Sequence, residues 1–315
     1  MIHEITKLKK ELAKAVIGQE NMIEGLLIGL LCEGHILVEG VPGLAKTTTI
    51  MAVSRALNLE SKRIQFTPDL LPSDIIGAEI YNPKDHSFSI KKGALFTHLL
   101  LADEINRAPA KVQSALLEVM QERQVTIGDE SFVLERPFLV MATQNPIEQE
   151  GVYALPEAQL DRFMMKILVS HNSEDEELEI MRKSAKKAFG KVEAVLDKEA
   201  LFALQERLEN IHIDAPLERY MVQLILATRN PLDFGLEGMA EQIMFGASPR
   251  ASIDLYKASR AKAFLSGKDF VSPSDIGAVF HAVLRHRVVL SYEARAKGIE
   301  VDSLLSTILE QVDIP

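Results

Sequence analysis

The sequence predicts an α/β protein in which a three-layer α/β/α domain with a central parallel sheet is followed by an all-α domain. Two observations predict this fold class. Up to residue 170, short runs that are apolar throughout alternate with helical patterns, which is typical of strands covered on both faces by crossover helices. From residue 171 onward the patterns are helical, and no run has strand character. The length of 315 residues, about twice that of an average domain, agrees with two domains, 1–170 and 171–315.

Five apolar runs in the first domain are the expected strands of the sheet. They are rich in Leu, Val, Ile and Phe, and polar or turn residues separate them. They occupy residues 35–40, 62–66, 98–103, 137–143 and 165–170. Between the third and fourth runs, Val112, Leu116 and Val119 recur at helical spacing. Pro109 suits the first position of a helix, so we expect a helix over 109–123.

Helices account for the second domain. Ser173 and Glu176 have the spacing of a capping box, in which each side chain bonds the other's backbone N–H, so we expect a helix to open there and reach Lys187. Five more helical patterns follow it along the chain. They occupy about 197–211, 216–229, 249–266, 274–286 and 301–312.

Charge and composition limit the classes of function. The hydrophobic share of 47% excludes a disordered chain, and 35 basic against 45 acidic residues give a net charge of −10, which disfavours nucleic acid as the main partner. Only the short basic runs at 8–10 and 285–287 interrupt the acidic balance. Cys32 can form no internal disulfide, so we expect a buried, inert thiol in a reducing cytoplasm. No signal peptide or run long enough to span a bilayer is present, so we expect no membrane insertion.

A strand–loop–helix segment carries a phosphate-loop pattern. The string GVPGLAKTT occupies 40–48 and fits G-x-x-x-x-G-K-[ST], except that Ala45 stands at the sixth position. In such a loop the backbone N–H groups hold phosphate, Lys46 pairs with the β- and γ-phosphates, and Thr47 binds Mg²⁺. The sequence therefore predicts a site for ATP and Mg²⁺. Its candidate binding residues are Gly40, Pro42, Gly43, Leu44, Ala45, Lys46, Thr47 and Thr48.

A second motif ends the expected strand at 98–103. The string LLLADE places Asp103 and Glu104 at the carboxyl edge of the sheet, where ligands of open parallel sheets bind. We expect Asp103 to hold the Mg²⁺ shell and Glu104 to polarise the water that attacks the γ-phosphate. An Asp-Glu pair alone is usually just solvated. The combination with a phosphate loop in one sheet is far more specific, and it predicts ATP hydrolysis.

With these motifs the chain resembles the AAA+ ATPases, and closely the MoxR family. The resemblance runs from residue 16 to at least 290, and it implies an AAA+ module, a P-loop core followed by a helical lid. The family's loop usually reads GxPGxAKT, which accommodates Ala45. The matching strings are VIGQE (16–20), GVPGLAKT (40–47), QFTPDLLPSDIIG (65–77), LLLADEINRAPAKVQSALLEVMQERQVT (99–126), ATQNPIEQEGVYALPEAQLDRF (142–163) and GASPRA (246–251).

The resemblance implies roles for residues outside the two motifs. Val16, Ile17 and Gly18 resemble the segment that borders the adenine. Asn145 resembles the polar sensor that orients the attacking water, although an Asn before a Pro also suits a turn.

Two arginines carry further implied roles. Arg162 resembles the arginine finger presented to a neighbouring subunit's ATP, while a surface ion pair is the plainer interpretation. Arg250 resembles the second sensor, which links the lid to the γ-phosphate. Ser248 and Pro249 predict a helix start there, and the helix dipole opposes a cation in the first turn by ~0.3–1 kcal/mol. A positive charge in that position suggests an anionic partner.

Two alternating segments resemble the family's hairpins. Residues 78–90 resemble the hairpin inserted in the second helix, and 125–134 the hairpin before the first sensor. In related rings these hairpins face the central channel, so Tyr81 and Phe88 are candidates for gripping a polypeptide. Cross-strand packing is an equally good interpretation. Residues 85–89 also spell D-x-S-x-S, the metal-site pattern of von Willebrand factor A domains, which we interpret as accidental within a hairpin.

The expected function is ATP hydrolysis by a ring-forming, chaperone-like remodeller. The family implies a hexamer and a protein client, with a von Willebrand factor A domain protein as a candidate, in the maturation or activation of a protein complex, including metal-cofactor insertion. The alternatives are a nucleotide-dependent assembly switch with little turnover, a DNA-acting AAA+ motor and a metal-chelatase motor subunit. Intact Asp103, Glu104 and Asn145 argue against the switch, and the net charge argues against DNA.

Overall fold

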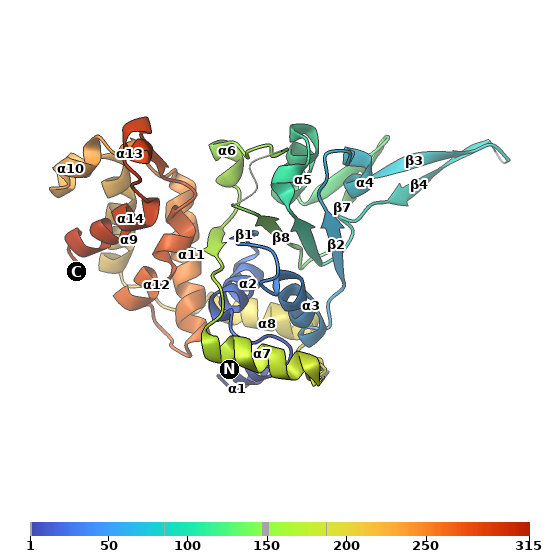
Figure 1. Ribbon diagram of the computed structural model, residues 1–315, viewed down its shortest axis with the longest axis horizontal. Coiled ribbons are helices and arrows are strands. Elements are labelled where there is room, and N and C mark those ends of the chain that lie inside the picture. Colours follow the sequence, from blue (N-terminus) through green and yellow to red (C-terminus); the bar gives the residue numbers. More distant parts are fainter. Residues whose placement is uncertain (1, 85, 147–150, 187) are drawn as a thin grey trace.

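The computed structural model describes residues 2–84, 86–146, 151–186 and 188–315. A five-stranded parallel sheet forms the centre of the first domain, with the order β2-β5-β8-β1-β9. Figure 1 shows helices above and below this sheet and a second, helical body beside it. The predicted three-layer domain and helical lid are therefore confirmed. The strands are β1 (Ile36–Glu39), β2 (Ser61–Gln65), β5 (Leu99–Asp103), β8 (Leu139–Gln144) and β9 (Met165–Leu168).

The inner strands β5, β8 and β1 are largely apolar because both faces of the sheet are buried there, whereas the edge strand β2 is mostly polar and partly exposed. Ile36 and Val38 of β1 pack into one hydrophobic cluster with helices on the lower face in Figure 1. Leu37, between them, points into a second cluster on the upper face. The helices of the lower face are α1 (Ile2–Leu12), α2 (Glu20–Cys32), α3 (Lys46–Ala56) and α8 (Lys198–Leu208), and those of the upper face are α4 (Pro72–Ile76) and α5 (Ala110–Glu122).

The structure bears on two expected helix starts and on the state of Cys32. Ser173 and Glu176 form the expected capping box at the start of α7 (Glu174–Ala185), and Lys187 lies outside the described residues. Pro109 precedes α5 and does not open it, since its ψ of 153° is extended. Cys32, at the end of α2, is partly and not fully buried, which corrects one part of the expectation. Removal of the thiol from water still raises its pKa to about 12, as expected for an inert cysteine.

The helical body packs against the β9 edge of the sheet. Buried residues of α2, β9 and the lid helices belong to one continuous hydrophobic cluster. Besides its helices, the lid has a two-stranded ribbon, β10 (Ile243–Phe245) and β11 (Val289–Leu290), whose strands are too short for a sequence pattern to predict. The remaining elements are α9 (Ala215–Arg229), η2 (Pro231–Phe234), α10 (Glu237–Ala240), α11 (Pro249–Leu265), α12 (Pro273–Leu284), α13 (Tyr292–Ala296) and α14 (Val301–Gln311).

The domain boundary at 170/171 stays a prediction about the chain's organisation. In space, α8 packs on α2 beneath the sheet, and α7 lies on the same side (Figure 1). Within the described ranges, no helix is both long and apolar enough to cross a bilayer.

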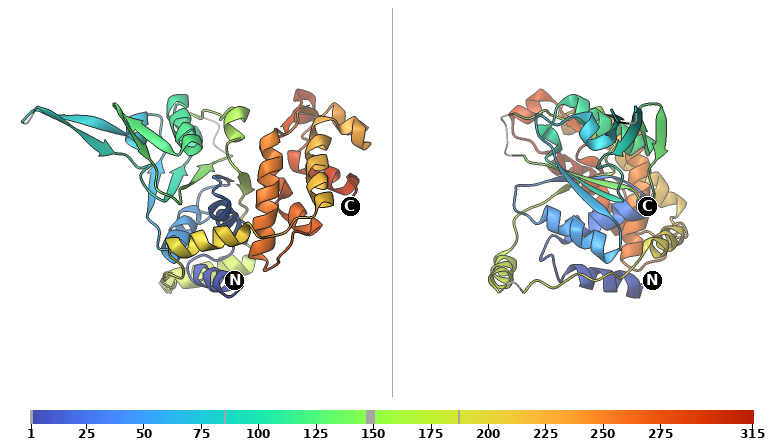
Figure 2. Two further views of the ribbon diagram at one scale, coloured as in Figure 1. Left: turned by 180° about the vertical axis from the view of Figure 1, so that it is seen from behind. Right: turned by 90° about the vertical axis from the view of Figure 1, so that its right-hand side faces the viewer.

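Both expected hairpins form. The first, β3 (Gly77–Asn82) with β4 (Ser87–Lys92), projects well away from the domain (Figures 1 and 2). Tyr81 pairs with Phe88 across it at 5.2 Å between ring centroids, yet the two residues stay 47% and 67% exposed. Cross-strand packing and an outward aromatic surface therefore coexist. The second hairpin is β6 (Gln124–Ile127) with β7 (Glu130–Val133). Asp85 of the D-x-S-x-S string lies outside the described residues.

Candidate functional site

The loop between β1 and α3 has the backbone shape of a phosphate cradle. Gly43 and Ala45 have φ angles of +88° and +55°, which curl the chain so that backbone N–H groups can converge on an anion. A Cβ atom at Gly43 would meet nothing within 4 Å, so glycine serves the backbone angle there. The first turn of α3 follows directly, and its N–H groups and dipole favour phosphate. Ala45 thus adopts the left-handed conformation that the loop requires.

A hollow of about 360 Å³ lies beside this loop at the carboxyl edge of the sheet. Apart from Gly40, every residue expected from the two motifs lines it, together with Asn145. Gly40 starts the loop, and its N–H donates to Gln144 O at 3.2 Å. Residues 147–150, which follow Asn145 in the TQNPIEQEG string, lie outside the described residues. The lining residues are 42–48, Arg63, Gln65, Asp103, Glu104 and Asn145.

Lys46 is the cation of the phosphate loop. Its Nζ donates to Gly40 O at 2.5 Å. Burial lowers the pKa of Lys46, and the carboxylates of Asp103, Glu104 and Glu39 oppose that shift. A half-buried ammonium gains more from a phosphate oxygen than a fully solvated one does, because the local dielectric is lower. Lys46 is therefore suited to bind phosphate oxygens.

Thr143 of β8 holds the two carboxylate residues of β5. Its hydroxyl donates to Asp103 Oδ1 at 2.6 Å and accepts the backbone N–H of Glu104 at 2.8 Å. Glu104 has a φ of +56°, a left-handed conformation that costs a non-glycine residue about 1–3 kcal/mol and persists only where neighbours hold it. The Thr143 hydrogen bonds supply that hold, so they fix the backbone from which the Glu104 side chain starts.

Two residues of β2, Arg63 and Gln65, complete the site, and they were not identified from the sequence. The guanidinium of Arg63 binds Asp103 Oδ2 at 2.7 Å, and Gln65 Nε2 donates to Glu104 Oε2 at 2.6 Å. Arg107 Nη1 also donates to Glu104 Oε2, at 3.1 Å. Both β2 residues reach the site because β2 pairs with β5, with Gln65 opposite Asp103. The polar side chains of Arg63 and Gln65 within an expected strand were a signal in the sequence. Their role can be assigned only when it is known that β2 lies next to β5.

The residues of the hollow fit a magnesium ion bound together with nucleotide. Thr47 and Asp103 line it and offer the oxygen ligands that Mg²⁺ prefers. In the part of the chain that the structure describes, no group of three or more His, Cys, Asp or Glu residues could hold a metal ion. Mg²⁺ commonly keeps water and substrate phosphate as most of its ligands, so the oxygens of Thr47 and Asp103 are enough to hold it beside a nucleotide.

The segment expected to border the adenine lies at the same sheet edge but outside the hollow. Gln19 Nε2 donates to Ser170 O at 3.1 Å, and Asn172 Nδ2 donates to Ile17 O at 3.0 Å. These bonds fix the segment that contains Val16 and Gly18 beside the end of β9, the strand next to β1. Its role at the adenine stays a prediction.

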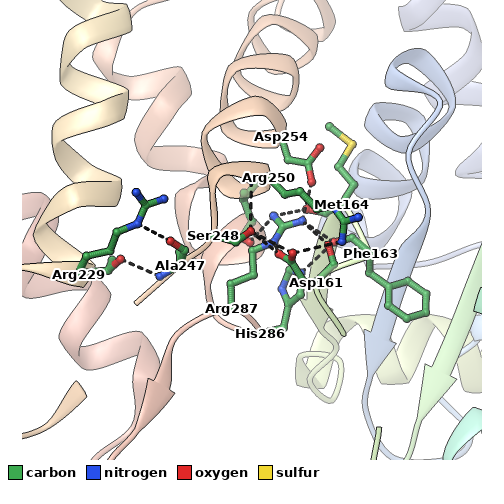
Figure 3. Close-up of polar contacts among 12 residues, drawn as sticks. Asp161, Phe163, Met164, Arg229, Ala247, Ser248, Arg250, Asp254, His286 and Arg287 are labelled. Atoms are coloured by element: carbon green, nitrogen blue, oxygen red, sulfur yellow. Dashed lines mark hydrogen bonds and ion pairs between the residues drawn. The ribbon is translucent and has the colours of Figure 1, made fainter. Parts of the chain in front are cut away.

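Arg162 and Arg250 line a different hollow, of about 260 Å³, that shares no residue with the phosphate hollow. Arg162 follows α6 (Glu157–Leu160), and its Nη1 donates to Leu117 O at 2.8 Å. Arg250 lies in the first turn of α11, as expected, and its Nη1 contacts Asp161 Oδ2 at 3.4 Å (Figure 3). The structure thus gathers the two motifs and Asn145 in one place and both arginines in another.

Family models match both parts of the chain. Residues 35–165 match the model described as ATPase family associated with various cellular activities (AAA). Residues 238–308 match the model of the AAA lid domain.

Individual relatives match along nearly the whole chain. Chaperone MoxR1 of Mycobacterium tuberculosis is 46% identical over 314 residues, which span 100% of this chain and 83% of that protein. Protein MoxR of Methylorubrum extorquens is 32% identical over 98% of this chain and 94% of its own length. A crystal structure of a protein from Cytophaga hutchinsonii has a TM-score of 0.94 and 48% identity, and covers 100% of this chain and 96% of that one.

The hydrogen bonds of Thr143 lead to a first testable expectation. Thr143→Val keeps the shape of the side chain but removes the bonds to Asp103 and to the Glu104 backbone. We expect ATP turnover to fall about ten- to a hundredfold, since bonds to charged groups contribute about 1.5–3 kcal/mol. ATP affinity should change little, because the phosphate loop is untouched. Phosphate release and nucleotide titration measure the two quantities.

The matched control is Thr126→Val in β6, where the same hydroxyl is lost from an exposed bond to Ser131. That variant should keep the parent turnover. Equal turnover in the Thr143 variant and the parent would contradict the role given to Thr143.

Proposed function

The chain belongs to the MoxR family of AAA+ ATPases, and on that premise we propose that it works as a ring whose ATP sites are shared between neighbouring subunits. One observation carries the proposal. Within one chain, Arg162 and Arg250 line a hollow separate from that of the phosphate loop. A neighbour in a closed ring would bring one subunit's arginines to the other's phosphate hollow. A hexamer is the ring size that the family resemblance favours.

Each residue of the phosphate hollow would have its own role in ATP hydrolysis: binding phosphate, activating water or holding Mg²⁺. The loop N–H groups and Lys46 bind the β- and γ-phosphates, and Glu104 polarises the attacking water. Gln65 and Arg107 both donate to Oε2 of Glu104 and so hold its carboxylate. Thr47 and Asp103 would hold Mg²⁺, which neutralises charge on the phosphate oxygens when bound. Asn145, at the end of β8, would orient the water.

The two arginines would act across the subunit boundary. The Arg250 side chain is 48% exposed although it lies in the first turn of α11, where the helix dipole disfavours a cation. A neighbour's triphosphate would satisfy both arginines. An arginine finger contributes about 10³–10⁵ in rate, so an isolated subunit would bind ATP but turn it over slowly.

The client would be a protein handled by the projecting β3–β4 hairpin. Exposed aromatic residues at Tyr81 and Phe88, on a ribbon that projects away from the domain, support this part of the proposal. A relative named as a chaperone supports remodelling as the task. We place the activity in the cytoplasm, in the maturation or activation of a protein complex. We propose metal-cofactor insertion as the specific maturation step and a protein with a von Willebrand factor A domain as the client.

One of the two short basic runs that a DNA-acting motor could use is turned inward. Of the basic run 285–287, the Arg287 side chain is only 1% exposed, and Arg285 pairs with Asp302. His286 is buried and bonds to Phe163 O. Groups turned inward in this way offer no positive surface to a phosphate backbone.

A mixing experiment tests the shared site. Arg162→Ala should keep ATP binding and lose about a thousandfold or more in turnover, as loss of an arginine finger does. Glu104→Gln should also bind ATP without hydrolysing it. When the two variants are mixed, some boundaries combine an intact Glu104 with an intact Arg162, so steady-state phosphate release should recover in part. Mixtures as inactive as the separate variants, in rings shown to contain both by copurification through a tag on one variant, would contradict a shared site.

The client contact is tested with the Glu104→Gln variant, which should bind ATP without hydrolysing it. Glu104→Gln held with ATP should retain client in a pull-down, and adding Phe88→Ser should lower the retained protein by about tenfold, as loss of an aromatic hot spot does. Phe245→Ser is the matched control, because Phe245 is 63% exposed on the lid. Equal retention by the Phe88 and Phe245 forms would contradict a client contact at the hairpin.

A further inference from the structure

A buried arginine joins the lid to the segment that carries Arg162. Arg287 follows α12, and its side chain is 1% exposed. Figure 3 shows its guanidinium surrounded by acceptors from both bodies. Its bonds run to Asp161 Oδ1 (2.9 Å) and Asp161 O (3.2 Å), Phe163 O (2.9 Å), Met164 O (3.3 Å), Val283 O (2.9 Å) and Asp254 Oδ2 (2.5 Å).

Asp161 is the acceptor that connects Arg287 to both functional arginines. Its carboxylate, 17% exposed, receives Arg287 Nε, the hydroxyl of Ser248 at 3.0 Å and Nη1 of Arg250 at 3.4 Å. Ser248 caps α11, so two of these contacts fix the end of the helix that carries Arg250. Arg162 is the next residue in the chain. A single residue therefore connects the two arginines: Asp161 bonds Arg250 through its carboxylate, precedes Arg162 in the chain, and contacts the lid at Ser248, Arg250 and Arg287.

The backbone around Arg162 is held in the same way. Carbonyl oxygens on either side of it, at Asp161, Phe163 and Met164, accept bonds from Arg287. His286 adds a bond to Phe163 O at 2.9 Å. The main chain on both sides of Arg162 is thus bonded to residues 286–287 of the lid.

Burying several charged groups together costs desolvation free energy. Burial raises the pKa of Asp254, and Arg287 opposes that shift. The guanidinium meets two carboxylates and four carbonyl groups, so its planar donors are used in full. Apolar residues of similar volume would often stabilise a fold as well or better. The retained polar cluster favours a role in orientation over a role in stability alone.

We propose that Arg287 is a positioning residue, which acts through Asp161 to hold Arg162 and Arg250 as one unit facing the neighbour's ATP. This inference rests on the proposed shared site. A lid that turned on the core would carry Asp161 with it, so Arg162 would move with Arg250. The lid of one subunit would thereby set hydrolysis in the next.

Arg285 provides the matched control, since it also joins lid and core. It donates to Asp302 Oδ2 at 2.8 Å and to Lys166 O at 3.1 Å. It contacts neither Asp161 nor the backbone on either side of Arg162. Arg285→Met removes a lid-to-core bond and an ion pair within the lid, and it leaves Asp161 untouched. Arg287→Met removes the lid-to-core bonds that end at Asp161 and at the backbone beside Arg162.

The test measures turnover and ATP affinity in both variants. Arg287→Met should lose about a hundredfold in turnover, the effect of a small misplacement of a catalytic group, with ATP affinity close to the parent's. Arg285→Met should keep the parent turnover. Parent-like turnover in Arg287→Met, or equal losses in both variants, would overturn the proposal.

Mixed rings separate positioning from a general structural role. Arg287→Met mixed with Glu104→Gln should recover activity, because the second subunit supplies correctly placed arginines. Arg287→Met mixed with Arg162→Ala should not recover, because both fail to supply them. Recovery in the second mixture would overturn the role given to Arg287 and leave the proposed shared site intact. Failure of Arg162→Ala with Glu104→Gln, run in parallel, would overturn the shared site itself.

A milder variant keeps the test decisive if Arg287→Met does not fold. Arg287→Lys retains a cation beside Asp161 and Asp254 but loses the forked bonds. We expect about a tenfold loss of turnover, less than for a full misplacement, with the same pattern in the mixtures. Full activity of Arg287→Lys would overturn the claim that the forked geometry matters.

Discussion

The carboxyl edge of the parallel sheet is the constraint on which the chemistry of this chain depends. Parallel strands end together, so β1 delivers the phosphate loop, β5 the two carboxylates, and β8 both Thr143 and Asn145, to one place. The hydroxyl of Thr143 then bonds Asp103 and the backbone of Glu104 at once. That hold maintains Glu104 in a backbone conformation that a non-glycine residue seldom adopts. Everything else in the site is arranged around this pair of carboxylates.

Much of this arrangement could be predicted from the sequence because it is local. The apolar strands, the phosphate loop, the Asp-Glu strand end and the capping box at Ser173 depend on neighbours within a few residues. Arg63 and Gln65 could not be assigned, because their role depends on β2 lying next to β5 in the sheet. The ribbon β10–β11 was missed because its strands are only three and two residues long.

The basic run at 285–287 is a second case in which the role of a residue depends on contacts distant in the sequence. As a string it looks like a short surface cluster, and only the packing of the lid on the core turns Arg287 inward onto Asp161. Charge patterns count residues but do not say which face they occupy. In a chain of net charge −10, we propose that function depends on a few cations whose positions the fold fixes. Lys46 belongs to the phosphate hollow, whereas Arg162 and Arg250 lie beside a lid contact in another hollow.

The central claim is that the catalytic unit is a pair of subunits and not a single chain. It is tested most directly by measuring ATP turnover per subunit against protein concentration, with the assembly state followed by sedimentation over the same range. We expect turnover per subunit to rise with concentration in step with assembly and then to level off, while ATP affinity stays constant. Constant turnover per subunit down to concentrations at which the chain is monomeric would contradict the account.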